Sequence, residues 1–283
     1  MGWSQINRRG FLAGTAGLAA LTGSRATLAA KPADSTGGDV KLGVASYSLR
    51  KLPRDKAIAV IKELKTPYVN IKEFHIPYKS TPEEIAAARK EFESAGLQIV
   101  GGGTVTLQKD DDEDVRKYFE YAKLCGMPLM VIAPTVQTVP RIEKFVKQYN
   151  IKVAIHNHGP EDKHFPAPRD VLKAVKGLDP RVGLCIDVGH TARTGADVVQ
   201  SIAEAGSRLL DMHMKDLRSI SAKESQCIVG EGAMPIVGIF KQLKKMNYPG
   251  FVNLEYEIDA DDPLPGMKQS FAYMRGVLAG LRG

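Results

Sequence analysis

The feature that most constrains the fold is a regular alternation of short apolar runs with amphipathic stretches of helical length. Eight apolar runs have the length and composition of strands. They span residues 41–46, 68–73, 98–103, 128–133, 152–156, 182–187, 209–213 and 251–255. Helix-like segments between them include residues 54–65, 81–96, 112–126, 140–150, 168–178, 196–206 and 234–247. Eight strand–helix repeats in about 250 residues predict an α/β fold, a single (β/α)8 barrel.

Other α/β folds fit this pattern less well. An open doubly wound sheet that binds a dinucleotide would carry a GxGxxG sequence after its first strand, and none is present there. The helix at 81–96 has clear ends, because Thr81 suits the N-cap, Pro82 the first turn and Gly96 the stop. The repeats therefore favour a closed barrel over residues 40–283.

The first thirty residues differ in character from the rest. Arg8 and Arg9 are followed by one glycine and then by Phe11 and Leu12. A weakly apolar stretch rich in Ala and Gly follows at 13–20. This stretch is too short to span a bilayer, and the paired arginines are typical of a twin-arginine export signal. We therefore expect a signal peptide at 1–30, a polar linker at 31–39, and a protein exported to the periplasm without stable membrane insertion after signal removal.

Charge and cysteine content exclude several classes of protein. The formal net charge is +7, and loss of a signal peptide with three arginines and no acid would lower it to about +4. Lysines alternate with acids on the helix-like segments, which is typical of solvated faces, so we expect no nucleic-acid partner. The three cysteines are widely spaced and contain no CxxC pair, which argues against a disulfide framework or a cysteine zinc site.

Polar residues gather where the predicted strands end. Five of the six histidines lie at or just after such an end, namely His75, His156, His158, His190 and His213. Carboxylates occupy equivalent places at Glu73, Asp187, Glu255 and Glu257. In a (β/α)8 barrel these ends surround the active site. A mixed set of nitrogen and oxygen donors there suits one divalent metal ion, Mn²⁺, Mg²⁺, Co²⁺ or Zn²⁺.

Three late sequences carry a family resemblance. "CIDVGH", "DMHMKD" and "NLEYE" occur in this order, each at the end of a late strand. Together they resemble the xylose-isomerase-like TIM barrels, the sugar phosphate isomerase/epimerase superfamily that also contains endonuclease IV. The resemblance covers about residues 40–280.

The resemblance implies roles for individual residues. Asp187, His213 and Glu255 match metal ligands, and His190 matches a substrate contact with a catalytic role. Lys215 and Glu231 match positions at the substrate end of the barrel, with Lys215 expected to assist catalysis. By their places at strand ends, the remaining residues expected to contact substrate are Glu73, His75 and His158.

Strand five departs from the family pattern. Many members have Glu followed by Asn there, whereas this chain reads "AIHNHG". His156 takes the place of the carboxylate as a metal ligand, with His158 as the alternative. Imidazole can bind the same metal, but it is not an equivalent proton acceptor.

The resemblance implies a metal-dependent sugar isomerase or epimerase. In that family a metal chelates a carbonyl and a neighbouring hydroxyl of a keto-sugar, a carboxylate removes a C–H proton, and the enediolate is held by the cation. Epimerisation uses two facing glutamates, and here only Glu255 matches. A metal-dependent lyase or hydratase of keto-glycosides and a non-catalytic carbohydrate-binding barrel are the alternatives. DNA repair, as in endonuclease IV, is disfavoured because export would separate the protein from genomic DNA. The expected partners are a small carbohydrate and, as a further option, a second copy of the chain.

Overall fold

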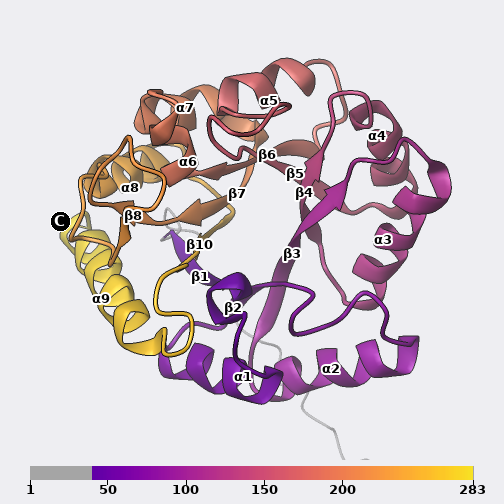
Figure 1. Cartoon of the computed structure of the whole chain (residues 1–283), viewed down its shortest axis with the longest axis horizontal. Helices are drawn as coiled ribbons and strands as arrows, with labels where there is room; N and C mark the ends of the chain where they lie inside the picture. The colour runs from indigo at the N-terminus through magenta and orange to yellow at the C-terminus, as the bar shows by residue number, and fades with distance from the viewer. Residues whose placement is uncertain (1–39, 283) are drawn as a thin grey trace, which may run out of the picture. The chain divides into compact units, whose positions relative to one another are not determined.

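The computed structural model describes residues 40–282 and contains a closed parallel barrel (Figure 1). Its strands are β1 (Lys41–Ala45), β2 (Tyr68–Ile71), β3 (Gln98–Leu107), β4 (Leu129–Pro134), β5 (Lys152–His156), β6 (Val182–Asp187), β7 (Leu209–Met214) and β10 (Phe251–Leu254). All eight predicted strands are present, and the (β/α)8 fold is confirmed. The predicted signal peptide and linker lie outside the described residues.

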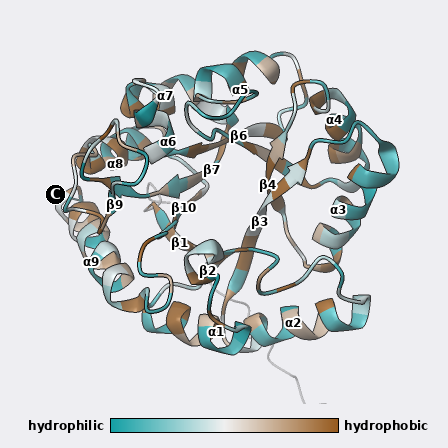
Figure 2. Cartoon of the chain, in the orientation of Figure 1, coloured by the Kyte–Doolittle hydropathy of each residue, from teal (hydrophilic) through white to brown (hydrophobic). Residues whose placement is uncertain are grey.

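Helices form the outer ring of the barrel (Figure 1). They are α1 (Arg54–Glu63), α2 (Pro82–Ser94), α3 (Asp112–Leu124), α4 (Val139–Tyr149), α5 (Pro168–Ala174), α6 (Val188–Arg193), α7 (Val198–Ala205), α8 (Ile236–Lys245) and α9 (Leu264–Gly280). Short 3-10 turns occur at Ser46–Leu49 and Gly206–Arg208. Hydrophobic and hydrophilic residues alternate along these helices (Figure 2), and the buried ones pack against the strands. No helix within residues 40–282 is long and apolar enough to cross a membrane.

The two ends of the described chain meet where the barrel closes. β1 pairs with β10, and α9 lies beside α1 (Figure 1). Arg275 of α9 donates to the carbonyl of Leu64 at 2.6 Å, and Lys268 forms an ion pair with Glu63. The last strand and helix therefore complete the same layers that the first ones begin.

Several features were not among the segments expected from the sequence, including the short helix α6. β3 runs four residues beyond its predicted end, with a register shift between Gly102 and Val105. A small antiparallel hairpin, β8 (Asp216–Leu217) and β9 (Gln226–Cys227), follows β7. The helix α9 lies outside β10 and β1 in Figure 1, and its Pro265 and Gly266 obscure the helical pattern at its start.

The barrel interior contains a polar cluster among its apolar side chains. Asp211 of β7 accepts one hydrogen bond from the Asn70 amide at 2.9 Å and one from the Asn253 amide at 2.7 Å. All three side chains are buried. Burial raises the pKa of Asp211 to about 6, although His213 and the two amides favour its charged form. Gly43 is required beside this cluster, because a Cβ there would lie 2.3 Å from Oδ1 of Asn253.

Candidate metal centre

Four side chains from neighbouring barrel strands converge at the C-terminal ends of these strands. His156 ends β5, Asp187 ends β6, His213 lies in β7, and Glu255 follows β10. These strands are adjacent in the sheet, and Asp187 is directly opposite His213 in register. One potential ligand atom from each of the four residues lies within 4.8 Å of the others, and all four side chains are buried.

The spacing of these atoms suits a single ion. Nε2 of His156 lies 3.1 Å from Nδ1 of His213, and that nitrogen lies 3.2 Å from Oε2 of Glu255. Nε2 of His156 lies 3.6 Å from Oδ2 of Asp187. Two donors bound tetrahedrally to one ion at ordinary bond lengths would be roughly 3.4 Å apart. The four residues therefore fit one divalent cation, with two nitrogen and two oxygen donors.

Asp187 serves two elements through its two oxygens. Oδ1 accepts from the backbone N–H of His190 at 2.8 Å and caps α6, while Oδ2 faces the centre. The backbone N–H of Asp187 donates to Oδ1 of Asn157 at 3.1 Å. The cap fixes the rotamer of Asp187, so Oδ2 is held in place before any ligand arrives.

A buried lysine lies between the carboxylates. Nζ of Lys215 is 3.0 Å from Oδ2 of Asp187 and 3.0 Å from Oε2 of Glu255, and it also pairs with Glu257. Its aliphatic part crosses Gly189, where a Cβ would come within 2.8 Å of it. The ammonium of Lys215 therefore pairs with the same two oxygens that the group of four would offer to a metal ion, and a bound ion would share them with it.

The protonation states follow from this arrangement. Burial by itself would raise the pKa of Asp187, but Lys215 and His190 hold it well below its ordinary value. Burial also opposes ionisation of Glu255, yet His213 and Lys215 lower the pKa of this carboxyl strongly. Burial would lower the pKa of Lys215, and the three carboxylates around it raise it well above the usual value. Burial would lower the pKa of His213, but its neighbours Cys185 and Glu255 raise it well above the ordinary value. At neutral pH the centre without a metal ion therefore contains two carboxylates, an ammonium group and an imidazolium, and a metal ion would have to displace the proton of His213.

The ring nitrogens of His156 are available to a cation. Burial lowers the pKa of His156, and it lowers that of His190 to about 3, although Asp187 favours the charged form of both rings. A neutral imidazole is the form that binds metal. Both rings are therefore neutral at neutral pH, and His156, which belongs to the group of four, is in the form that binds metal.

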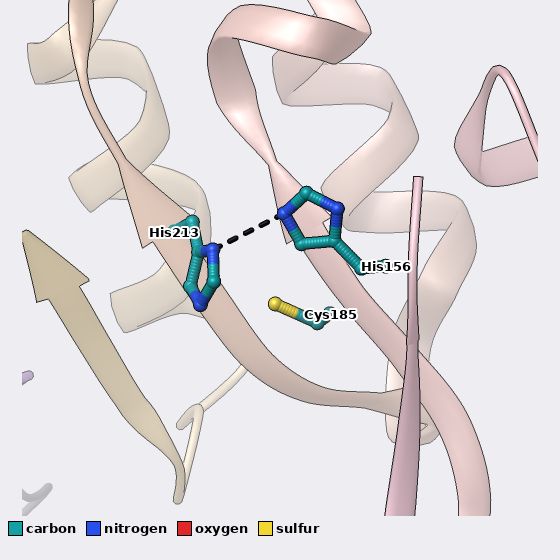
Figure 3. A group of neighbouring side chains, drawn as sticks. All are labelled: His156, Cys185 and His213. Carbon is teal, nitrogen blue, oxygen red and sulfur yellow. Dashed lines mark hydrogen bonds between the residues drawn. The ribbon is translucent and has the colours of Figure 1, made fainter. Parts of the chain in front are cut away.

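A cysteine not expected at the site lies beside the two histidines. Figure 3 shows the Cys185 sulfur directed towards the rings of His156 and His213. Burial raises the pKa of this thiol to about 12, so it is protonated at neutral pH. Cys185 precedes Asp187 by two residues on β6, and strand periodicity places both side chains inside the barrel. The three cysteines are free and buried, and they form no disulfide.

A cavity of about 350 Å³ adjoins the centre. Its walls include Lys215, His190 and Glu257 on the side of the centre, with Leu217 and Gln226 from the β8–β9 hairpin. Its volume is in the range of small-molecule sites. Lys215 lies between this cavity and the carboxylates of Asp187 and Glu255, and it can contact a ligand bound in the cavity.

The two strand-five histidines are placed differently. His156 belongs to the group of four, whereas His158 is exposed and outside it. The rings of His158 and His190 lie 4.7 Å apart, measured between centroids. His158 and His190 therefore form an edge of the site rather than its centre.

Three predicted contact residues lie away from the cavity wall. His75 is buried, and its ring nitrogens lie 3.1 Å from Oγ of Ser46 and 3.2 Å from the carbonyl of Leu49. Glu73 pairs with Lys72 at 3.1 Å, and the exposed Glu231 pairs with Arg218 at 3.1 Å. Their substrate-binding roles stay predictions.

Two polar residues that organise the site had no signal in the strand pattern. Asp216 accepts backbone N–H bonds from Gly230 and Met234 at 2.8 and 3.0 Å, which ties the loop containing Glu231 to β8. Gln226 bonds to the backbone on both sides of Tyr256. The adjacent Lys215 and Asp216 in "HMKD" thus have different partners. Lys215 contacts the carboxylates of the centre, and Asp216 accepts hydrogen bonds from the backbone of a loop.

The fold and the site together define the class of protein: a (β/α)8 barrel whose strand ends carry a group of histidines and carboxylates that could hold a metal ion. A family model described as xylose isomerase-like TIM barrel matches residues 58–277. The chain belongs to this family, and the predicted resemblance is confirmed.

Curated relatives match part of the chain. An inosose dehydratase of Mesomycoplasma hyopneumoniae strain 7448 is 27% identical over 162 residues, which cover 50% of this chain and 53% of that protein. The chain thus spans about half the length of the first curated relatives it matches.

Solved structures share the whole barrel. The IolI protein with a bound zinc atom has a TM-score of 0.72 at 15% identity, covering 85% of this chain and 99% of that one. The 3-keto-D-glucoside 4-epimerase of E. coli has a TM-score of 0.67 at 18% identity, covering 84% and 99%. These likenesses show the fold.

Proposed function

We propose that this protein is a divalent-metal-dependent enzyme that enolises a keto-sugar or a sugar derivative. The observation that supports this most is the convergence of His156, Asp187, His213 and Glu255 beside the ammonium of Lys215. The relatives named as an inosose dehydratase and a keto-glucoside epimerase, and the zinc in IolI, agree with it. The identity of the metal stays open among Mn²⁺, Mg²⁺, Co²⁺ and Zn²⁺.

The residues divide the chemistry between them. A divalent ion held by the four residues would withdraw electrons from the carbonyl and hydroxyl oxygens of a substrate and acidify the neighbouring C–H. Glu255 is ionised, and its carboxylate accepts that proton. Lys215 carries a proton on Nζ and donates a hydrogen bond to negative charge that develops on a substrate oxygen. His190 and Glu257 line the cavity and contact the rest of the substrate.

The outcome of enolisation depends on the fate of the enediolate, which either regains a proton or loses a β-substituent. Epimerisation needs one group that removes the C–H proton and another on the opposite face of the reacting carbon that returns one. His156 stands where many family members have the second carboxylate. With one carboxylate base, elimination of a β-substituent is the second candidate, as in a lyase or hydratase of keto-glycosides. The name of the relative inosose dehydratase favours this alternative.

The test compares two glutamates in solvent exchange. The metal content of the purified protein is measured, and a panel of keto-sugars and keto-glycosides is then incubated in D₂O and followed by NMR for deuterium incorporation. Glu255→Gln should slow exchange by about a hundredfold or more, the usual scale for a general base. Glu257→Gln is the matched control, because it removes a carboxylate that also contacts Lys215.

Each contrary outcome has a distinct meaning. Loss of exchange in Glu257→Gln with retention in Glu255→Gln would assign the base to Glu257. Absence of exchange with the metal-loaded wild-type protein across the panel, together with sugar binding, would favour the non-catalytic carbohydrate-binding barrel.

We also propose that the protein is exported through the twin-arginine pathway. The support is the pair Arg8 and Arg9 before an apolar stretch. Replacement of both arginines by lysine should retain the precursor in the cytoplasm, which fractionation and immunoblotting would detect. Normal export of the double variant would remove this proposal and leave the enzymatic one untouched.

A further inference from the structure

The segment that carries Glu255 and Glu257 leaves the barrel sheet directly after β10. The N–H of Glu255 still donates to the carbonyl of Met214 at 2.9 Å. Beyond this bond, side chains take the place of a neighbouring strand. Oγ of Ser48 donates to the carbonyl of Leu254 at 3.2 Å and accepts from the N–H of Tyr256 at 2.8 Å.

Gln226 holds the other edge of the same segment. Its Nε2 donates to the carbonyl of Glu255 at 2.6 Å, and its Oε1 accepts from the N–H of Glu257 at 2.8 Å. In a parallel sheet one residue bonds in this way to the C=O of residue i and the N–H of residue i+2 on its neighbour. The Gln226 carboxamide has one donor group and one acceptor group, and it therefore replaces a residue of an absent strand.

Gln226 also belongs to the wall of the cavity. It begins β9 of the β8–β9 hairpin, which lines the cavity with Leu217, Lys223, Glu224 and Gln226. The hairpin and the end of β10 thus share a two-point connection beside Lys215, which contacts both Glu255 and Glu257. A displacement of the hairpin would be transmitted to the backbone of the two glutamates.

We propose that Gln226 is a positioning residue that sets the Glu255 carboxylate for metal binding and proton transfer and the Glu257 carboxylate for its contact with Lys215, and that couples both to the hairpin lining the cavity. The proposal rests on the proposed function for its catalytic part. Its metal-binding part stands on the hydrogen bonds alone, because a ligand oxygen shifted by about half an ångström no longer meets the required geometry.

The test uses two substitutions and a matched control. Gln226→Met keeps the length of the side chain and removes both bonds, whereas Gln226→Glu keeps an acceptor for the N–H of Glu257 and loses the donor. Gln200→Met is the control, since Gln200 forms an exposed bond to Glu204 on α7. The full chain is loaded with Co²⁺, and its affinity and visible absorption spectrum are recorded with amide hydrogen exchange.

The expected pattern is local. Gln226→Met should bind Co²⁺ at least tenfold more weakly with an altered spectrum, and peptides containing residues 255–257 should exchange faster than in the wild type. Gln226→Glu should fall between the two, and Gln200→Met should match the wild type. On a substrate that the wild type turns over, kcat should fall more than KM rises.

Wild-type Co²⁺ affinity, spectrum and exchange in Gln226→Met would overturn the inference. If Gln226→Met does not fold, the same measurements on Gln226→Glu decide the question. If no keto-sugar is turned over by the wild type, the proposed function fails, while the Co²⁺ and exchange measurements still test the position of the glutamates.

Discussion

At the scale of single residues, Asp187 combines a structural and a chemical role. One oxygen caps α6 and the other faces the metal centre. A substitution therefore mixes two effects, and a control has to separate them. Asp197 offers this control, because its side chain caps α7 by accepting from the N–H of Gln200 at 2.9 Å, away from the centre.

Replacement of Asp187 by Ala should remove most of the metal affinity, and Asp197→Ala should not. The first loses a ligand and a negative charge, while both lose a helix cap worth about 1 kcal/mol. Isothermal titration with Mn²⁺ or Zn²⁺ measures the affinity, and thermal unfolding measures the cost of the cap. Full metal occupancy in Asp187→Ala would show that the centre lies elsewhere.

The sequence placed His156, Asp187, His213 and Glu255 at strand ends that meet here, but it placed Glu73 and His75 there too, and it did not show how the residues connect. Histidines and carboxylates at strand ends were visible because the barrel brings those ends together. The contacts of Lys215 with Asp187 and Glu255 join residues 28 and 40 positions apart, and side-chain rotamers decide them. Cys185 looked like a buried strand residue, and only the interior geometry places it beside His156 and His213.

At the scale of elements, periodicity and end signals predicted most strands and helices. The repeats at 81–96 and 234–247 correspond to α2 and α8. The β8–β9 hairpin has two residues in each strand, too few to form a pattern. The extension of β3 depends on pairing with β4, which a local sequence does not reveal.

The start of α2 gives a prediction at this scale. Oγ1 of Thr81 accepts from the N–H of Glu84 at 3.3 Å, and Glu84 accepts from the N–H of Thr81 at 2.8 Å, which forms a capping box. Thr81→Ala should lower the free energy of unfolding by about 1 kcal/mol and leave metal affinity unchanged. Urea unfolding and metal titration check both parts. A change in metal affinity would mean that α2 supports the centre directly.

At the scale of the whole molecule, the buried Asp211 makes stability depend on pH. Its pKa is about 6 in the folded barrel against 3.8 for a free group, so the folded state binds this proton more tightly than the unfolded state. Its contribution to stability is therefore fully present below about pH 4 and is lost as the pH rises through about 6. The change amounts to about 3 kcal/mol.

Asp211→Asn should abolish this component. The difference in unfolding free energy between wild type and variant, measured by urea titration from pH 4 to 7 with a chelator present, should change by about 2 kcal/mol across the interval, because the unfolded carboxyl is already partly ionised at pH 4. A constant difference over this range would mean that Asp211 does not titrate within it.

The same aspartate links distant parts of the chain during assembly. Its two amide donors, Asn70 and Asn253, lie 141 positions before it and 42 positions after it. Enclosure of the carboxylate without these two donors would cost several kcal/mol. The barrel thereby gains cooperativity from a polar group placed where only the complete circle of strands can satisfy it.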